Sequence, residues 1–369
     1  MKPHLRMGTI SDAERLLLAC LFAAVFAAGA RSEPREALPW NRSGRRVALA
    51  SLERGAAKAV PGRYSWLCPS KEVGALAIDG DTLWIGTEGG LFAMDLFLDV
   101  VEPVSGPASI SIRTIAVGEG SLWVGGDHSA SARSGGRWRH YPAEANPLFQ
   151  QLRCLAAGDG RLWIGAFGSG LGYIVGDAVT IVSSAEAGVD QRVLSIAEQS
   201  PTTIYFGTAS GLMLADTSGW KSLRYGNRLP IGPVGSLAFD EEGDLFCSIL
   251  GQGAAIYSFG RVRTFGAERG TPGLYVRAFS LDPSTRRMWA AGADGVFVYD
   301  GAEWMRQDLP GIDSRRRFLS MKHDAEGTCY LGTDDGAVVV LSDGAAREIR
   351  VPLAFPERRI ARLRTVGET

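Results

Sequence analysis

Short apolar runs separated by glycine-containing turns recur along most of the chain. The first group of runs and turns reads Gly74–Ile78, Asp79–Asp81, Thr82–Gly86, Glu88–Gly90, Leu91–Met94 and a looser run near 100–104. Asp-Gly and Gly-Gly pairs between apolar runs favour tight hairpins, because these residues tolerate the positive φ that such turns need. The pattern predicts four short antiparallel strands in this group.

The second run of the group belongs to a phrase that occurs seven times. Each copy has an aromatic residue at its second position and ends on a small residue: Leu83–Gly86, Leu122–Gly125, Leu162–Gly165, Ile204–Gly207, Leu245–Ser248, Met288–Ala291 and Cys329–Gly332. The copies end 39 to 43 residues apart. A period near forty, built from short β-type runs, is typical of a blade repeated around an axis. We therefore predict an all-β fold, a single seven-bladed β-propeller of four-stranded antiparallel blades over residues 74–352.

The apolar runs also predict how the blades pack. In the first run of each group large and small residues alternate, and successive strand residues point to opposite faces. The small positions are Ala77, Ala116, Ala156, Ser195, Ala238, Ser280 and Ser320. The aromatic residues of the phrase are Trp84, Trp123, Trp163, Tyr205, Phe246, Trp289 and Tyr330. We expect these aromatic side chains to be buried between blades as core, and not to form a stacking platform for a ligand.

The start of the chain carries a targeting pattern. A fifteen-residue apolar stretch, Leu16–Ala30, follows three basic residues and ends in the small-x-small pattern Ala28-Gly29-Ala30. This arrangement is typical of a Sec signal peptide, and the stretch is short for a membrane span. We expect residues 1–30 to be a signal peptide, with a retained anchor as the alternative. The mature protein would then be periplasmic or extracellular and have no membrane span.

Two further segments flank the repeats. In the N-terminal segment 31–73, the run Arg46–Ala50 would pair at a sheet edge or cap an opening of the ring, since open edges are usually covered. The last group already supplies four runs of its own, ending at Arg347–Val351. Residues 353–369 form a charged C-terminal tail.

Charge and cysteine content exclude some classes of function. The net charge is −1, so a nucleic-acid partner is not expected. The chain has 34 Arg and only 5 Lys. We attribute this excess of arginine to a GC-rich genome and not to recognition chemistry, which would require the arginines to be placed at a site. The cysteines after residue 30 show no metal-ligand spacing and are expected to be small buried residues: Cys68, Cys154, Cys247 and Cys329. A contact between Cys68 and Cys329 stays open, because ring closure would bring them close.

The copies resemble the two-component regulator propeller repeat, which reads Val-x-x-Ile-x-x-Asp-x-x-Gly-x-Leu-Trp-Ile-Gly-Thr-x-x-Gly-Leu. The matching residues are Asp79, Leu83–Thr87 and Gly90-Leu91 in the first group, Gly207-Thr208 and Gly211-Leu212 in the fourth, and Gly332-Thr333 and Gly336 in the seventh. The second group departs from the pattern at Asp127–Ser134, which we expect to form a distinct loop. The resemblance implies a periplasmic ligand sensor of a membrane histidine kinase. No kinase or DNA-binding segment follows Pro352, so a free-standing exported propeller is expected.

The sequence contains few groups of residues that could form a catalytic site. His128, His140 and His323 are the histidines after residue 30, and none has a partner at triad or metal-ligand spacing. Four aspartates recur at the first turn of their groups and are expected to cap these turns: Asp79, Asp240, Asp282 and Asp324. The acidic run 240–244 could hold calcium but lacks the EF-hand spacing. We therefore expect no cofactor and no metal.

One recurring position carries candidate binding chemistry. Two residues before the first large apolar residue of each group stand Gly74, Arg113, Arg153, Arg192, Gly235, Arg277 and Arg317. This position begins the innermost strand, where loops converge on the mouth of the central channel. Guanidiniums gathered there repel each other unless acidic side chains or an anionic ligand compensate them. The five arginines therefore either pair with nearby carboxylates or bind an anionic small molecule, an acidic glycan or an acidic protein loop.

These observations favour an exported ligand-binding, sensory or protein-interaction module over an enzyme. The alternative is an exported propeller-type lyase or hydrolase acting on an acidic or glycan substrate, which would need histidines and carboxylates gathered at the channel mouth. A second alternative is a protein-interaction platform built on the Asp127–Ser134 segment.

Overall fold

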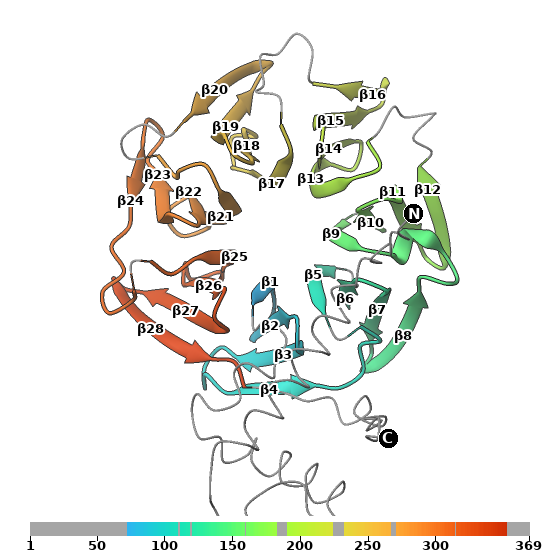
Figure 1. Ribbon diagram of the computed structural model, residues 1–369, viewed down its shortest axis with the longest axis horizontal. Coiled ribbons are helices and arrows are strands. Elements are labelled where there is room, and N and C mark those ends of the chain that lie inside the picture. Colours follow the sequence, from blue (N-terminus) through green and yellow to red (C-terminus); the bar gives the residue numbers. More distant parts are fainter. Residues whose placement is uncertain are drawn as a thin grey trace, which may run out of the picture. The chain divides into compact units, whose positions relative to one another are not determined.

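The chain forms a ring of seven four-stranded antiparallel sheets (Figure 1). The structure is a computed structural model that describes residues 72–109, 111–118, 120–158, 160–182, 190–223, 232–266, 271–313 and 315–352. The expected signal peptide, the run Arg46–Ala50, Cys68 and the tail 353–369 lie outside the described residues. The predicted seven-bladed β-propeller is confirmed.

The blades share one strand order, in which each strand pairs with its sequence neighbours. The innermost strands are β1 (Val73–Asp79), β5 (Ile112–Gly118), β9 (Leu152–Gly158), β13 (Val193–Ser200), β17 (Val234–Phe239), β21 (Val276–Asp282) and β25 (Phe318–His323). The second strands carry the repeated phrase and are β2 (Thr82–Thr87), β6 (Ser121–Gly126), β10 (Arg161–Ala166), β14 (Thr203–Thr208), β18 (Leu245–Ile249), β22 (Arg287–Gly292) and β26 (Cys329–Thr333).

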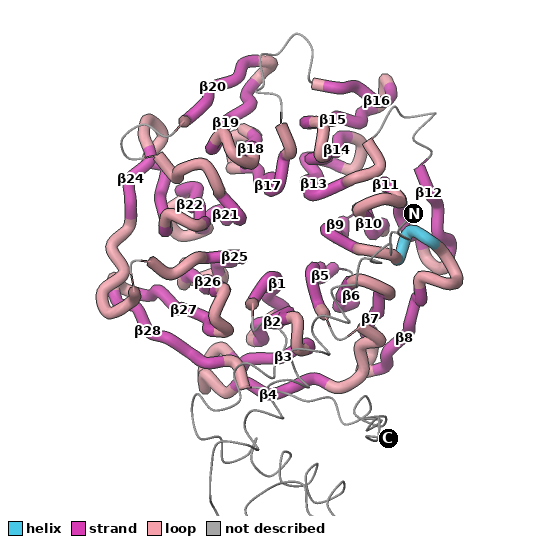
Figure 2. The backbone as a smooth tube through the Cα atoms, in the orientation of Figure 1, coloured by secondary structure: helices cyan, strands magenta, loops and turns pink. Residues whose placement is uncertain are grey.

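The outer half of each blade is built in the same way. The third strands are β3 (Gly90–Asp95), β7 (Ser129–Ser134), β11 (Gly170–Val175), β15 (Gly211–Asp216), β19 (Gly253–Ser258), β23 (Gly295–Tyr299) and β27 (Ala337–Ser342). The outermost strands are β4 (Val101–Val104), β8 (Arg137–Pro142), β12 (Ala178–Val182), β16 (Gly219–Ser222), β20 (Arg261–Phe265), β24 (Trp304–Arg306) and β28 (Ala345–Arg350). The helical segment in Figure 2 is the short 3-10 helix η2 (Pro147–Phe149).

The second blade corrects one expectation from the sequence. Segment Asp127–Ser134 is not a distinct loop, because its last six residues form β7 and pair with both β6 and β8. The strand is rich in serine and alanine, so it lacks the apolar alternation that marks the other third strands. Its small side chains are buried, and Ser131 Oγ accepts a hydrogen bond from the Ala108 amide at 3.0 Å. The segment considered as an interaction platform is therefore part of the sheet and not an inserted loop.

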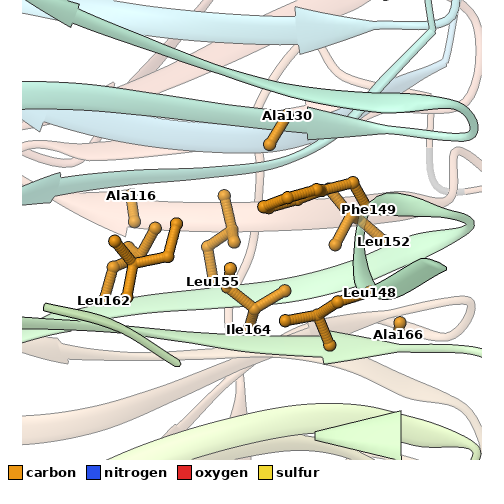
Figure 3. Close-up of a cluster of buried hydrophobic side chains, with 10 residues drawn as sticks. Ala116, Ala130, Leu148, Phe149, Leu152, Leu155, Leu162, Ile164 and Ala166 are labelled. Carbon is orange, nitrogen blue, oxygen red and sulfur yellow. The ribbon is translucent and has the colours of Figure 1, made fainter. Parts of the chain in front are cut away.

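The hydrophobic core is divided among the interfaces between blades. The described residues form seven buried clusters, and each of them joins two neighbouring blades. Figure 3 shows one of them, in which Ala116 of the second blade packs near Leu155 and Leu162 of the third. The aromatic residues of the phrase are buried or half-buried, and each belongs to the cluster shared with the following blade. Their prediction as core is confirmed.

Close approach between blades explains the glycine that ends the phrase. A Cβ added to Gly165 would lie 2.6 Å from Val193 Cγ1, and a Cβ added to Gly332 would lie 2.5 Å from the Val73 carbonyl oxygen. In both cases the neighbour is the first residue of the next innermost strand. In these two blades the glycine thus lets the next innermost strand begin directly against the preceding blade.

The threonine after this glycine caps the next turn. Thr87 Oγ1 accepts a hydrogen bond from the Gly89 amide and donates one to the Gly90 carbonyl oxygen, both at 3.0 Å. Thr208 Oγ1 donates to the Gly211 carbonyl oxygen in the same way at 2.9 Å. These contacts give a structural reason for the Gly-Thr-x-x-Gly spacing in the sequence.

The junction between the seventh and first blades repeats the junctions inside the ring. Ser320 Oγ donates to the Val73 carbonyl oxygen at 2.8 Å, as Ser195 Oγ donates to the Val234 carbonyl oxygen at 3.1 Å. On the outer rim Arg347 forms a bidentate ion pair with Asp99, at 3.0 and 2.9 Å. Within the described residues, the ring closes by packing and these bonds, without a strand exchanged between blades.

Candidate ligand site at the entry face of the ring

One face of the ring brings together the starts of all the innermost strands. Because the strands of a blade alternate in direction, the turn between the second and third strands lies at the same end as the start of the innermost strand. We call this end of the ring the entry face. It carries the candidate arginines, together with turn residues such as Glu88, Asp127, Phe167 and Asp334.

Strand pairing divides the five candidate arginines into two groups. The apolar residues that pair with the third residue of the phrase are Leu76, Ile115, Leu155, Ile196, Leu237, Phe279 and Met321. Two residues before them stand Gly74, Arg113, Arg153, Leu194, Gly235, Arg277 and Leu319. The alignment of all five arginines at one position is therefore wrong. Arg113, Arg153 and Arg277 share it, whereas Arg192 and Arg317 lie two positions earlier, just before β13 and β25.

The same register corrects the small positions of the fourth and seventh blades. Ala197 pairs with Tyr205 and Lys322 pairs with Tyr330. Ser195 and Ser320 therefore do not occupy the small position opposite the phrase aromatic. They hold the hydrogen bonds between blades described above, and the seventh blade has a lysine where alanine or serine was expected.

The position shared by the three arginines is a β-bulge. In the second blade Ile112 pairs with Gly126 and Thr114 with Gly125, so that Arg113 has no partner in the ladder. A bulge re-aims the side chain of its extra residue. At the equivalent Gly74 an added Cβ would have no atom within 4 Å. The bulge thus directs these arginines away from the packed interface between blades.

Arg113 is neutralised within its own blade. Its Nε and a terminal nitrogen donate to the two carboxylate oxygens of Asp127 at 2.6 and 3.1 Å. This hydrogen-bonded pair raises the pKa of Arg113. The Asp127 carbonyl oxygen also accepts the Gln151 amide of the third blade at 2.8 Å, which fixes the pair against that blade.

Arg153 is a half-buried guanidinium that has no ion-pair partner among the described residues. Its Cζ lies 5.4 Å from the ring centre of Phe167, which is 39% exposed. Burial and then the neighbouring Arg113 lower the pKa of Arg153, while Asp127 opposes this shift. The charged form of Arg153 is therefore not fully compensated by the protein.

Arg277 interacts electrostatically with Glu72. Glu72 precedes β1, and its pKa is raised by burial first and then by Glu88 and Asp334, whereas Arg113 and Arg277 lower it. One carboxyl group thus interacts with charges from the first, second, sixth and seventh blades. The entry face therefore combines acidic and basic groups, with the carboxylates gathered near the first blade.

Arg192 and Arg317 differ from the other three. Arg192 forms a bidentate ion pair with Asp190 at 3.0 and 2.8 Å, and this pair together with Ser210 lowers the pKa of Asp190 to about 2. Arg317 is exposed, and its carbonyl oxygen accepts the Asp334 amide at 3.3 Å. The structure therefore brings Arg113 and Arg153 together and holds Arg192 in a local pair. Glu72 interacts with both Arg113 and Arg277.

The other chemical groups singled out in the sequence have local roles. The cap role is confirmed for three aspartates, because the amides of Asp244, Ser284 and Thr328 donate to Asp240, Asp282 and Asp324 at 2.7, 2.9 and 2.8 Å. His128 is exposed on the turn before β7, whereas His140 and His323 bond to Ser131 and Ser280. The three histidines thus lie in separate surroundings.

The free thiols follow the expected pattern of burial. Cys247 and Cys329 are buried and Cys154 is half-buried. The contact considered between Cys68 and Cys329 is not described, because Cys68 lies outside the described residues. The described part of the chain contains no helix with the length and apolar character needed to span a bilayer.

No protein-family model matches the chain, and no curated protein matches it. Among solved structures, it is similar to the extracellular domain of BT3049 from B. thetaiotaomicron, which is named as a hybrid two component system. The identity is 19% and the TM-score 0.63, over 75% of this chain and 39% of that one. The extracellular domain of BT4673 from the same organism, named as a one component system, matches at 18% identity and TM-score 0.60, over 73% of this chain and 38% of that one.

A third solved structure, the WD40 β-propeller domain of Doa1, has 15% identity and a TM-score of 0.56. The match covers 74% of this chain and 93% of that domain. This chain spans about two fifths of the length of the two B. thetaiotaomicron chains. At these identities the comparisons show a shared fold, and the function has to be argued from the site.

Proposed function

We propose that the protein is an exported sensory or ligand-binding propeller that holds an acidic group of its ligand at Arg153 on the entry face. The observation that carries this proposal is the half-buried guanidinium of Arg153, which has Arg113 beside it and no carboxylate in the described residues at ion-pair distance. A cation in this position is stabilised by an anion that hydrogen bonds to it, because charge-assisted bonds are stronger where solvent is partly excluded. The propeller neighbours from extracellular domains of sensor systems support the sensory and exported parts of the proposal.

The surroundings of Arg153 indicate the kind of ligand. Arg113 is already paired with Asp127 and does not offer a free donor to the ligand. Its charge still acts on Arg153 more strongly than the charge of Asp127 does. Phe167 supplies an exposed apolar ring next to the guanidinium. Near the first blade Glu72, Glu88 and Asp334 repel further negative charge. These features favour a small carboxylate or an acidic sugar residue over a densely charged polyanion, with Arg277 as a secondary contact.

Removing the guanidinium of Arg153 is expected to abolish ligand binding without unfolding the ring. The mature protein is first screened by thermal shift against dicarboxylates, uronic acids, uronate oligosaccharides and an acidic peptide, and the best ligand is then titrated by calorimetry. We expect Arg153→Ala to weaken binding by at least about tenfold, which is the loss of one charge-assisted contact. Arg277→Ala is expected to have a smaller effect. Binding by the unaltered protein should weaken as salt is added, because part of the site is open to solvent.

Arg192→Ala is the matched control for this experiment. Arg192 lies on the same face, just before β13, but Asp190 already neutralises it. Its removal should leave the affinity unchanged. Equal losses in both variants, or full affinity in Arg153→Ala, would show that Arg153 does not hold the ligand.

A further inference from the structure

Lys322 occupies a position on the innermost strands where every other blade has a small residue. By strand pairing, the residues opposite the aromatic of the phrase are Ala77, Ala116, Ala156, Ala197, Ala238, Ser280 and Lys322. The first six fit between blades because they are small. β25 pairs only with β26, so its other edge is turned toward the axis of the ring (Figure 1). Lys322 therefore adds a long cationic side chain to the inner wall of the ring.

The direction of the Lys322 side chain follows from its neighbours. His323, the next residue, bonds to Ser280 of the sixth blade at 2.9 Å. Successive strand residues point to opposite faces, so Lys322 is on the face turned toward the first blade. Its partner Tyr330 is buried in the cluster that joins these two blades. Lys322 itself is exposed, so its side chain leaves this packed interface and reaches solvent near the end of β25 that lies away from the entry face.

The carboxylates around Lys322 are engaged with other groups. Asp282 at the end of β21 accepts hydrogen bonds from Ser284 and Thr285. Asp324 after β25 accepts them from the Tyr330 hydroxyl and from the amides of Glu326 and Thr328.

Two other titratable groups belong to the strands that meet here, and neither forms an ion pair with Lys322. Asp79 ends the facing strand β1, and His323 is held by Ser280. Among the described residues, none forms an ion pair with Lys322. The surrounding protein lowers the pKa of Lys322, while its side chain stays accessible to solvent. Both properties agree with an ammonium that reaches solvent while protein surrounds it on the inside of the ring.

We propose that Lys322 forms a second anion site, in which its ammonium binds one small oxyanion on the inner wall of the ring, at the end opposite to the entry face. An ammonium that stands on the inner wall of the ring without a counter-charge gains a charge-assisted hydrogen bond when an oxyanion binds to it. Carboxylate and phosphate share the chemistry required. This site is independent of the one proposed at Arg153, because it uses another blade and the other end of the innermost strands.

The small number of lysines allows a direct test. The whole chain has 5 Lys, so reductive methylation with ¹³C-formaldehyde gives a spectrum with few dimethyl-lysine resonances. Lys322→Ala assigns the resonance of Lys322, and this variant should fold because alanine stands at the same position in five other blades. Lys221 is the internal control, since it is paired with Asp216 at 2.8 Å.

The pKa of each lysine is measured by pH titration, in sodium chloride and then with inorganic phosphate or acetate at equal ionic strength. An oxyanion at Lys322 favours the charged form and should raise the pKa of Lys322 by about half a unit or more, while the pKa of Lys221 stays unchanged. A response to phosphate alone identifies a phosphate site, and a response to both anions identifies a general oxyanion site. The same anion should raise the melting temperature of the unaltered protein and of Arg153→Ala, but not that of Lys322→Ala. The proposal is overturned if neither anion moves the Lys322 titration, or if both move Lys221 equally.

Discussion

Gly332→Ala is expected to destabilise the propeller by about 3 kcal/mol, at the upper end of the cost of overpacking a closed interface. The added Cβ would lie 2.5 Å from the Val73 carbonyl oxygen and 2.6 Å from Val73 Cγ1, and it would also collide with Ser320 Oγ. The carbonyl oxygen belongs to backbone and cannot rotate away. It is also the acceptor of the Ser320 hydrogen bond, at 2.8 Å, so the seventh and first blades would have to move apart.

Gly74→Ala provides the control for this prediction. Gly74 stands next to Val73 on β1, and an added Cβ would have no atom within 4 Å. Its stability should stay within about 0.5 kcal/mol of the unaltered protein. Denaturant unfolding and the melting temperature of both variants give the comparison. If Gly332→Ala were as stable as Gly74→Ala, the seventh blade would not depend on this close approach to the first.

The fold was predictable because most copies of the phrase contain the residues on which the packing between blades depends. An aromatic residue such as Trp163 fills the space toward the next blade, and the glycine that follows it, Gly165, admits the first residue of that blade. Both requirements depend only on residues close in sequence and on the same neighbour relation repeated around the ring. Periodicity alone therefore identified the blade and the number of blades.

The candidate site was less predictable because it depends on strand register. Leu194 and Leu319 resemble the first large apolar residue of a strand, but strand pairing places them at the bulge and gives that role to Ile196 and Met321. A bulge adds one residue without changing the local composition. Alignment by apolar residues therefore shifted Arg192 and Arg317 onto the position of Arg113. Anchoring each copy on the aromatic of the phrase and counting backwards would have avoided this error.

Other features depend on contacts between distant parts of the chain. The carboxyl group of Glu72 interacts with Arg277, more than two hundred residues away, because ring closure brings their blades together. Phe167 is an ordinary turn residue in the sequence and becomes relevant only when Arg153 lies over it. The strand β7 could not be predicted for a different reason. Its small polar residues are buried in the sheet and form hydrogen bonds, such as that of Ser131, that the pattern of apolar residues does not indicate.

Acid should destabilise the interface between the sixth and seventh blades well above the pH at which carboxylates titrate. The imidazole of His323 packs 5.1 Å from the ring centre of Trp289, and its Nδ1 lies 2.9 Å from Ser280 Oγ. Among the described residues its Nε2 is buried and has no hydrogen-bond partner. Burial lowers the pKa of His323 from 6.5 to about 4, although Asp282 and Asp324 oppose this shift. The folded protein therefore keeps this imidazole neutral at pH values where an unfolded chain protonates it.

The depressed pKa fixes the sign of the effect, because the unfolded state binds the proton first as the pH falls. The contribution of His323 is fully present above pH 6.5 and is lost as the pH falls toward 4, with a total of about 2–3 kcal/mol. Denaturant unfolding at several pH values between 7 and 4 measures this loss. His323→Gln cannot be protonated, so this part of the pH dependence should disappear. His140→Gln should retain it, because His140 is exposed on the outermost strand β8. If His323→Gln kept the full loss between pH 6.5 and 4, the acid sensitivity would have to arise from groups outside this interface.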